Sequence, residues 1–205
     1  MHSTLTSKEM FSSIVSGIIS SAMFLFFLWN LKPKFTLSPN ISCDYTQYRG
    51  SMTHLFFFKI INKSFLFKVY EIKVKAFVVK EINNLNGNDL LLTPIIMEFN
   101  SLALIERFNF RHIFQFYIGD NNLQSRTDYA AQFFTKSDAR KELNQDGHSI
   151  FFQVMAKHSL TGFTTVKTMK YHHALRIQNG KFLSGNSFKI VEYRQDTESN
   201  TNNQI

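Results

Sequence analysis

The strongest pattern in the chain is an uncharged, mostly apolar segment near its N-terminus, from Met10 to Leu31. As an α-helix rising about 1.5 Å per residue, this segment would be about 33 Å long, which is enough to cross the hydrocarbon core of a bilayer. A secretory signal has a shorter apolar core and a cleavage site of small residues behind it. This segment instead runs into WNLKPK at 29–34, which is typical of an interfacial anchor. The pattern predicts a retained transmembrane helix at 10–31, with a buried core helix as the alternative.

The predicted helix has one face of small residues. Its first half carries serine and glycine at four-residue spacing, which places them in rows along one broad face. The rows are Ser12, Ser16 and Ser20, and Ser13, Gly17 and Ser21. Small residues let transmembrane helices approach closely, and serine hydroxyls bond across such contacts or face water. We expect this face to pack against another helix or to face a pore; the alternative is a lone span whose serines bond to their own backbone.

The charges that flank the helix predict its orientation. Lys8 and Glu9 precede it and cancel, whereas Lys32 and Lys34 follow it. The positive-inside rule then places the C-terminal side in the cytoplasm, so we expect a single-pass protein of the inner (cytoplasmic) membrane with a cytoplasmic C-terminal domain. Together with Trp29, the two lysines are predicted to lie at the lipid interface.

Beyond the helix, the hydrophobic pattern is typical of β-strands. Apolar and charged residues alternate between 68 and 80, which predicts a strand with one buried face, and the continuous apolar run at 54–61 suits a buried strand. An Asn-Gly pair within 83–89 indicates a hairpin, and Pro94 implies an edge strand or a bulge. Further strands are predicted at 90–99, 102–108, 148–158, 163–173, around 182 and at 188–193. Many short strands separated by turns predict a β-sandwich.

The same patterns predict the domain boundaries. Two prolines stop the helix from continuing, so residues 32–42 are expected to be an extended, membrane-proximal linker. A short helix at 135–143 is expected to begin with Ser137 or Thr135 as its N-cap. The pattern at 110–123 favours no particular secondary-structure element. The predicted organisation is a polar lead at 1–9, the transmembrane helix at 10–31, the linker at 32–42, the β-sandwich at 43–193 and a disordered tail at 194–205.

Composition narrows the classes of function. The formal net charge is +8, but the basic residues are scattered, which favours attraction to anionic lipid over binding of nucleic acid. Cys43 is the only cysteine, so an intramolecular disulfide framework is excluded. No phosphate-binding glycine loop and no hydrolase or metalloprotease motif occurs, and neighbours such as His172 and His173 on a strand would point to opposite faces. We predict that the protein is not an enzyme and has no catalytic residues, no metal and no cofactor.

Several stretches occur in a recognisable order. They are the junction at 32–34 and 37–41, YRGSMT at 48–53, HLFFFKIIN at 54–62, YEIKVKA at 70–76, and 152–156, 164–165 and 168–174 late in the chain. This order resembles the C-terminal part of the inward-rectifier potassium channel family, where an inner pore helix leads to a cytoplasmic domain. The resemblance implies a mainly β protein with one N-terminal transmembrane helix followed by an immunoglobulin-like β-sandwich of the inward-rectifier cytoplasmic type. It also implies a homo-oligomer, a tetramer, that meets anionic lipid headgroups near Lys32 and Lys34.

The departures from that family shape the functional expectation. Residues 182–188 do not match its aromatic-Gly-His-Arg-aromatic motif, and the outer helix, the pore helix and the filter loop are not found in the sequence. The nearest filter-like string, at 117–120, is predicted to be a turn. We therefore expect a regulatory or sensor module related to ion channels and not a selective potassium pore. The alternative is an oligomeric membrane effector whose helices form an unselective pore on signal binding, in toxicity or defence; a scaffold for a protein partner is a third possibility.

Overall fold

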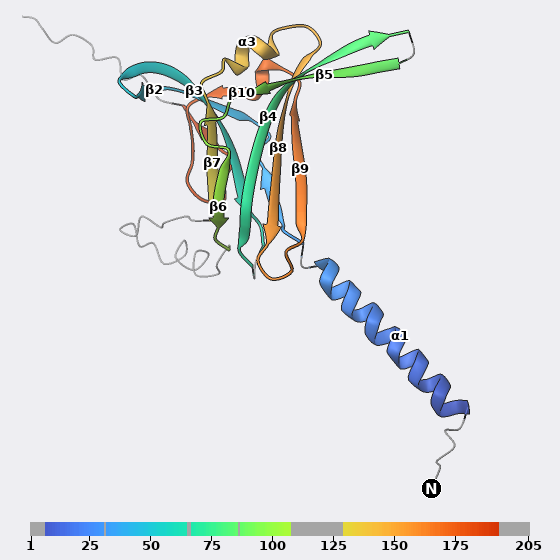
Figure 1. The fold of residues 1–205 in the computed structure, drawn as a ribbon. Coiled ribbons are helices and arrows are strands. Elements are labelled where there is room, and N and C mark those ends of the chain that lie inside the picture. The colour runs from blue at the N-terminus through green and yellow to red at the C-terminus, as the bar shows by residue number, and fades with distance from the viewer. Residues whose placement is uncertain (1–6, 31, 65–66, 86, 108–128, 193–205) are drawn as a thin grey trace, which may run out of the picture.

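The structure is a computed structural model that describes residues 7–30, 32–64, 67–85, 87–107 and 129–192. It consists of one N-terminal helix and a β-sheet domain (Figure 1). The expected tail at 194–205, the segment 110–123 with the filter-like string, and the first residues of the polar lead lie outside the described residues.

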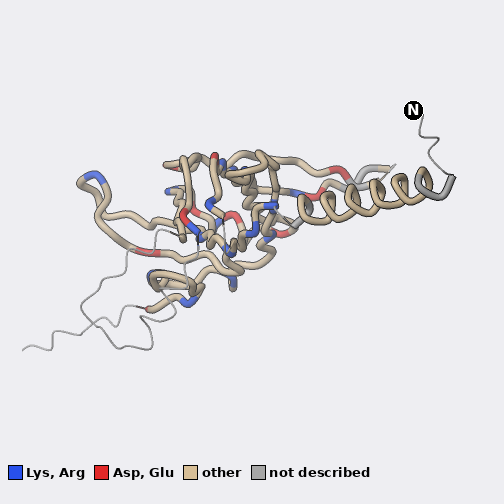
Figure 2. Tube along the Cα trace, turned by 90° about the horizontal axis from the view of Figure 1, so that it is seen from below, with Lys and Arg blue, Asp and Glu red and all other residues tan. Residues whose placement is uncertain are grey.

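Helix α1 (Ser7–Asn30) projects from one end of the β domain (Figure 1). Its stretch Met10–Leu28 has a mean hydropathy of 2.0, and none of it is buried against the rest of the chain. In Figure 2 the tan part of this helix carries no basic or acidic position, whereas such positions are spread over the domain. The prediction of an N-terminal helix that is long and apolar enough to cross a membrane is confirmed.

The first sheet is organised around β3 (Ser51–Asn62). β3 pairs antiparallel with β1 and β2 along one edge and with β7 along the other, and β10 pairs parallel with β2. The bounds of these strands are Phe35–Leu37 for β1, Ile41–Tyr48 for β2, Ala130–Thr135 for β7 and Ile177–Asn179 for β10. The predicted strand at 54–61 lies within β3 and is confirmed.

The second sheet has the order β5-β4-β8-β9, and β6 also pairs with β4. Its long strand β4 (Val69–Asn84) contains the alternating pattern that predicted it. The other bounds are Gly87–Ile95 for β5, Ser101–Ile105 for β6, His148–His158 for β8 and Thr164–Tyr171 for β9. Pro94 lies on the edge strand β5, as expected for a residue without an amide hydrogen.

Four short elements complete the described part of the domain. The helix α3 comprises Ala139–Leu143, and the 3-10 helix η1 comprises Ala174–Arg176. β11 (Lys181–Phe182) and β12 (Ile190–Val191) form a two-stranded sheet of their own. These elements agree with the sequence-based expectation of a helix near 139 and short strands late in the chain.

The two large sheets enclose a common core. Phe58 of the first sheet stacks on Phe152 of the second with ring centroids 4.5 Å apart, and Tyr171 lies 5.9 Å from Phe58. All three side chains are buried, and the Tyr171 hydroxyl donates a hydrogen bond of 2.7 Å to the carbonyl of Ser38. Burying one such ring stabilises the fold by about 1.5–3 kcal/mol. The domain is therefore mainly β with sandwich-like sheets.

The expectation of a linker at 32–42 is wrong for most of that segment. Residues 35–37 form β1, which pairs with β3, and Phe35, Leu37 and Ile41 are buried. The break that Pro39 introduces lies between β1 and β2, where the Ser38 amide still bonds to the Lys59 carbonyl at 2.9 Å. The domain thus begins about eight residues earlier than the predicted boundary at 43.

Two smaller expectations also need correction. The N-cap of α3 is Asp138 and not Ser137 or Thr135, because its carboxylate accepts hydrogen bonds of 3.0 Å from the amides of residues 140 and 141. Thr135 instead lies in β7. His172 and His173 follow the end of β9, so the argument that neighbouring strand residues point to opposite faces does not apply to them.

Candidate functional site

The two rows of small residues on α1 have no partner within the described chain. All six side chains are exposed, and no heavy atom lies within 4 Å of the position that a Cβ on Gly17 would take. At about 100° per residue, the rows together cover about half of the helix circumference. The structure thus brings Ser12, Ser16 and Ser20 alongside Ser13, Gly17 and Ser21 on one face, which no described residue of the domain covers.

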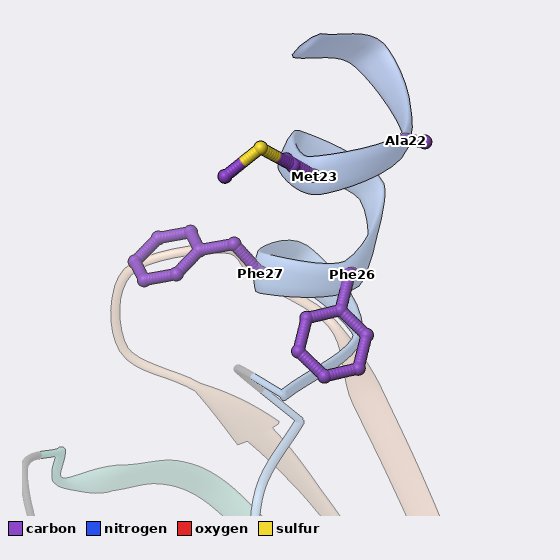
Figure 3. A pocket seen from close by; sticks show the side chains of 4 residues that line it. All are labelled: Ala22, Met23, Phe26 and Phe27. Atoms are coloured by element: carbon purple, nitrogen blue, oxygen red, sulfur yellow. The ribbon is translucent and has the colours of Figure 1, made fainter. Parts of the chain in front are cut away.

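Further along α1 the side chains are bulky. Figure 3 shows Met23 and Phe27 projecting from the same side of the helix, with Phe26 and Ala22 on other sides. These four residues line an open apolar depression. Phe26 and Phe27 are 67% and 58% exposed, so the bulky half offers its rings to the surroundings of the helix. A hydrocarbon environment or a neighbouring helix suits such a surface.

The described residues at 33 and 34, shortly after α1, are held by the sandwich. Pro33 is buried, the Lys34 amide donates to the Ser64 hydroxyl at 3.1 Å, and the Lys34 carbonyl accepts from the Lys63 amide at 2.7 Å. Five extended residues span about 18 Å at most, so the buried Phe35 lies within that distance of Asn30. The end of the domain therefore stays close to the end of the helix.

The residues predicted at the lipid interface lie at this junction. The side chains of Lys32 and Lys34 are exposed on the short chain between α1 and β1. Trp29 lies in the last turn of α1, and its side chain is outside the described part of the structure. The structure thus places both lysines next to the end of the helix, where a lipid contact would need them.

Four further segments of the sandwich meet at the same end. β1 begins there, opposite the end of β3, and Val69 at the start of β4 pairs with Ile105 and with His158 at the ends of β6 and β8. We call this region the α1 end, defined as residues 32–35, 62–64, 67–69, 105–107 and 157–164. In Figure 1 it is the end from which α1 leaves the domain.

Basic side chains are in excess at the α1 end. Lys68 pairs with Glu106 at 2.6 Å, and this hydrogen bond raises the pKa of Lys68. Lys34, Lys63 and Arg107 are exposed and form no ion pair with a described carboxylate, although Lys63 Nζ donates a hydrogen bond to the side-chain oxygen of Asn186. The described part of this end therefore carries a net positive charge at neutral pH.

His158 fixes the turn that closes the α1 end. Its Nδ1 accepts hydrogen bonds of 3.3 Å from the amides of Leu160 and Thr161, and the Phe67 ring packs edge-on 4.6 Å away. Burial lowers the pKa of His158, so the neutral imidazole required by these bonds is favoured. The backbone closes the turn with a bond of 2.8 Å from the His158 amide to the Phe163 carbonyl.

Lys59 is a buried cation on the opposite face of β3 from the core ring of Phe58. Its Nζ donates to the carbonyls of Leu183 and Ser187 at 2.5 and 2.7 Å, which fastens the segment before β12 to the first sheet. Burial lowers the pKa of Lys59 to about 8. Since both acceptors are backbone carbonyls of the same chain, we assign Lys59 a structural role.

The described residues offer little reactive chemistry. No group of three or more His, Cys, Asp or Glu side chains among them is placed to hold a metal ion. Cys43 Sγ lies 3.7 Å from His54 Nδ1, but burial raises the pKa of Cys43, which opposes formation of a thiolate. Among the described residues, the structure shows an exposed small-residue face on α1 and exposed basic side chains at the α1 end.

Sequence reasoning missed the apolar residues of the β8–β9 turn. Leu160 and Phe163 are 68% and 41% exposed at the α1 end; residues 159–162 were assigned only as a turn, and Phe163 as the start of the strand predicted at 163–173. The available signal was the large apolar residue at 160 within a turn, where Gly, Asn, Asp and Ser are the usual residues. It gained meaning only when the fold placed this turn beside the end of α1.

Comparison with known proteins leaves the family open. No protein-family model matches the sequence, and no curated protein matches it significantly. The resemblance to inward-rectifier channels therefore stays a prediction that rests on the stretches quoted above.

Proposed function

We propose that this chain is a single-pass membrane protein whose sandwich acts as a regulatory or sensor module of the inward-rectifier cytoplasmic type. It is related to ion channels and is not itself a selective potassium pore or an enzyme. The observation that carries this proposal is the attachment of Lys34, four residues after the end of α1, to residues 63 and 64 of the sandwich. A displacement of the sandwich would then reach the helix over a short distance, because only three residues stand between Asn30 and Lys34.

The exposed small-residue face of α1 supports self-association. Close packing of such faces would bury Ser13, Gly17 and Ser21 between helices, and the tetramer implied by the family resemblance would bundle four of them. The excess of Lys32 and Lys34 on the C-terminal flank supports a cytoplasmic sandwich in the inner membrane, near anionic lipid headgroups.

A second candidate function is an unselective pore. It is favoured by the row of exposed hydroxyls at Ser12, Ser16 and Ser20, which would line a water-filled path if the helices assembled around it. In this alternative, signal binding to the sandwich opens the bundle as a toxicity or defence device.

Cysteine cross-linking along α1 tests the coupling between sandwich and helix. In the full chain carrying Cys43→Ala, single cysteines at positions 12–21 are oxidised in lipid vesicles. If sandwich and helix are coupled, the yield of cross-linked dimer should vary along positions 12–21 with the period of a helix. Insertion of a five-residue Gly-Ser linker after Leu31 should weaken this variation. Equal insertion near Leu85, at the far tip of the β4–β5 hairpin, is the matched control and should leave it intact.

Ion flux from the same vesicles separates the two functions. The regulatory module predicts no leak of K⁺ or Na⁺ above that of empty vesicles. A leak that disappears when Ser12, Ser16 and Ser20 are all replaced by Leu would favour the pore. An unchanged period after the insertion at residue 31 contradicts the coupling.

A further inference from the structure

Two large apolar side chains protrude from the turn between β8 and β9. Leu160 is 68% exposed and Phe163 is 41% exposed, in a turn of the sandwich and not on the span. Single exposed apolar residues are common on soluble domains, so exposure alone decides nothing. The position of this turn relative to α1 gives the exposure its meaning.

The β8–β9 turn lies at the same end of the domain as the point where the chain leaves α1. The Lys167 side chain of β9 donates to the Phe35 carbonyl at 2.6 Å, so β9 starts beside β1, the first strand after the helix. Phe35 lies within about 18 Å of the end of α1. Figure 1 shows the β8–β9 turn and the C-terminal end of α1 at the same end of the domain.

The interfacial layer has room for these side chains. Headgroups add about 5–7 Å to each side of the hydrocarbon core. A helix that spans the core with Met10–Leu28 therefore holds the α1 end against this layer. The turn is also held in shape by His158 Nδ1, so little conformational entropy remains to be lost when it contacts lipid.

The surrounding charge matches an anionic surface. Lys34, Lys63 and Arg107 are exposed at the same end, and the nearby carboxylate of Glu106 is already paired with Lys68. Basic side chains around an apolar tip are the combination expected for contact with anionic headgroups and the acyl boundary beneath them.

We propose that the β8–β9 turn is a second membrane contact, in which Leu160 and Phe163 insert into the interfacial layer of the bilayer that α1 crosses. Lys34, Lys63 and Arg107 lie against anionic headgroups around them. This contact would fix the tilt of the sandwich relative to the membrane and so set the position from which it acts on α1. The inference rests on the membrane anchorage given under the proposed function.

Tryptophan fluorescence in vesicles tests the contact. Trp29 is the only tryptophan, so Trp29→Phe provides a blank background for Leu160→Trp or Phe163→Trp in the full chain. In vesicles of phosphatidylglycerol and phosphatidylcholine, both reporters should emit at shorter wavelength than in water. Lipids brominated on their acyl chains should quench them at least twofold. Leu175→Trp, which is 89% exposed beyond the opposite end of β9, is the control and should stay unquenched.

The outcomes separate the contact from the anchorage. In the unmodified chain, quenching of Trp29 fluorescence by brominated lipid shows that α1 is in the bilayer. If Trp29 is not quenched, the membrane anchorage itself is rejected. Quenched Trp29 with unquenched, iodide-accessible reporters at 160 and 163 rejects the turn contact alone. Short-wavelength emission without quenching by brominated lipid also overturns it, because the turn would then pack against a second copy of the chain or another protein.

The role of charge is tested by the lipid and by Lys63→Glu with Arg107→Glu. Quenching of the Leu160→Trp reporter should fall in vesicles of phosphatidylcholine alone and in the doubly substituted chain. Lys141→Glu, at an exposed lysine of α3 at the end of the domain opposite to α1 in Figure 1, is the charge control and should have no effect. If quenching is the same in both lipid compositions, in the doubly substituted chain and in the charge control, the basic residues do not contribute to the contact.

Discussion

Helix α1 and the β-sandwich are both rich in apolar residues, yet they treat them in opposite ways. In the sandwich, Phe58 and Phe152 are fully buried against each other, whereas Phe24 and Phe26 on α1 are more than 60% exposed. The sandwich hides apolar surface within its own chain, and α1 has none of its span buried. The contrast teaches that the sandwich satisfies its apolar residues within its own chain, whereas α1, which is long and apolar enough to cross a membrane, leaves them to its surroundings.

Separating the two parts should produce the largest effect. Deletion of residues 1–31 should leave a water-soluble, folded, β-rich domain, because the rest of the sequence has no comparable uncharged apolar run. Deletion of residues 1–37 removes β1 as well and should unfold the domain or leave it aggregated. Sedimentation and circular dichroism distinguish these results. Membrane pelleting of the shorter deletion at high salt would show that the sandwich has an anchor of its own.

Replacing a phenylalanine by alanine should have a large effect on stability in the sandwich and almost none on α1. Phe58→Ala should lower the free energy of unfolding of the sandwich by about 3–5 kcal/mol, because it opens a cavity beneath Phe152. Phe24→Ala, on α1, should change it by less than about 0.5 kcal/mol. Urea titration of the full chain in detergent, followed by the β signal in circular dichroism, measures both. Similar losses for the two variants would mean that α1 packs on the sandwich.

The pH dependence of stability should report Lys59. Burial lowers its pKa from 10.5 to about 8 in the folded protein, so the unfolded chain binds more protons between these values. Stability should therefore rise with pH across this window, by at most about 3 kcal/mol relative to Lys59→Met. Parallel unfolding profiles of the two proteins from pH 7.5 to 10.5 would show that Lys59 keeps an ordinary pKa.

The smallest effects are expected on the helix face. Gly17→Leu has space within one chain, so it should leave the sandwich intact and shift cross-linked oligomers toward monomers. Ser13→Ala and Ser21→Ala should each cost the contact about 0.6 kcal/mol, because interhelical hydrogen bonds are weak on average. Oligomers that resist Gly17→Leu would have to be held by contacts between the sandwiches.

Strong periodicity made most of the fold predictable from the sequence. The alternation in β4 and the uncharged run of α1 each specify an element without help from neighbours. β1 could not be found, because a three-residue strand between two prolines carries too little pattern and exists only through its pairing with β3. The cap at Asp138 was missed because Thr135, a plausible N-cap, is used by β7 and donates to the Ile96 carbonyl at 2.6 Å.

Only part of the candidate site could be predicted from the sequence. Lys32, Lys34 and the small-residue rows are local in the chain and could be named from spacing and flanking charge. Leu160, Phe163 and Arg107 come from distant segments, and only the pairing of Val69 with both Ile105 and His158 brings their loops to the end that carries α1. A contact surface assembled by tertiary structure has no signature in local sequence.

The topology of the anchored chain tests the account most directly. Leu175→Cys in a Cys43→Ala background gives one exposed thiol on the sandwich, to be labelled in bacterial cells with a membrane-impermeant maleimide. The account predicts that the protein stays in membranes washed at alkaline pH and reacts only after the inner membrane is permeabilised. Release into the soluble fraction, or labelling in cells whose inner membrane is intact, would contradict a membrane-spanning α1 with a cytoplasmic sandwich.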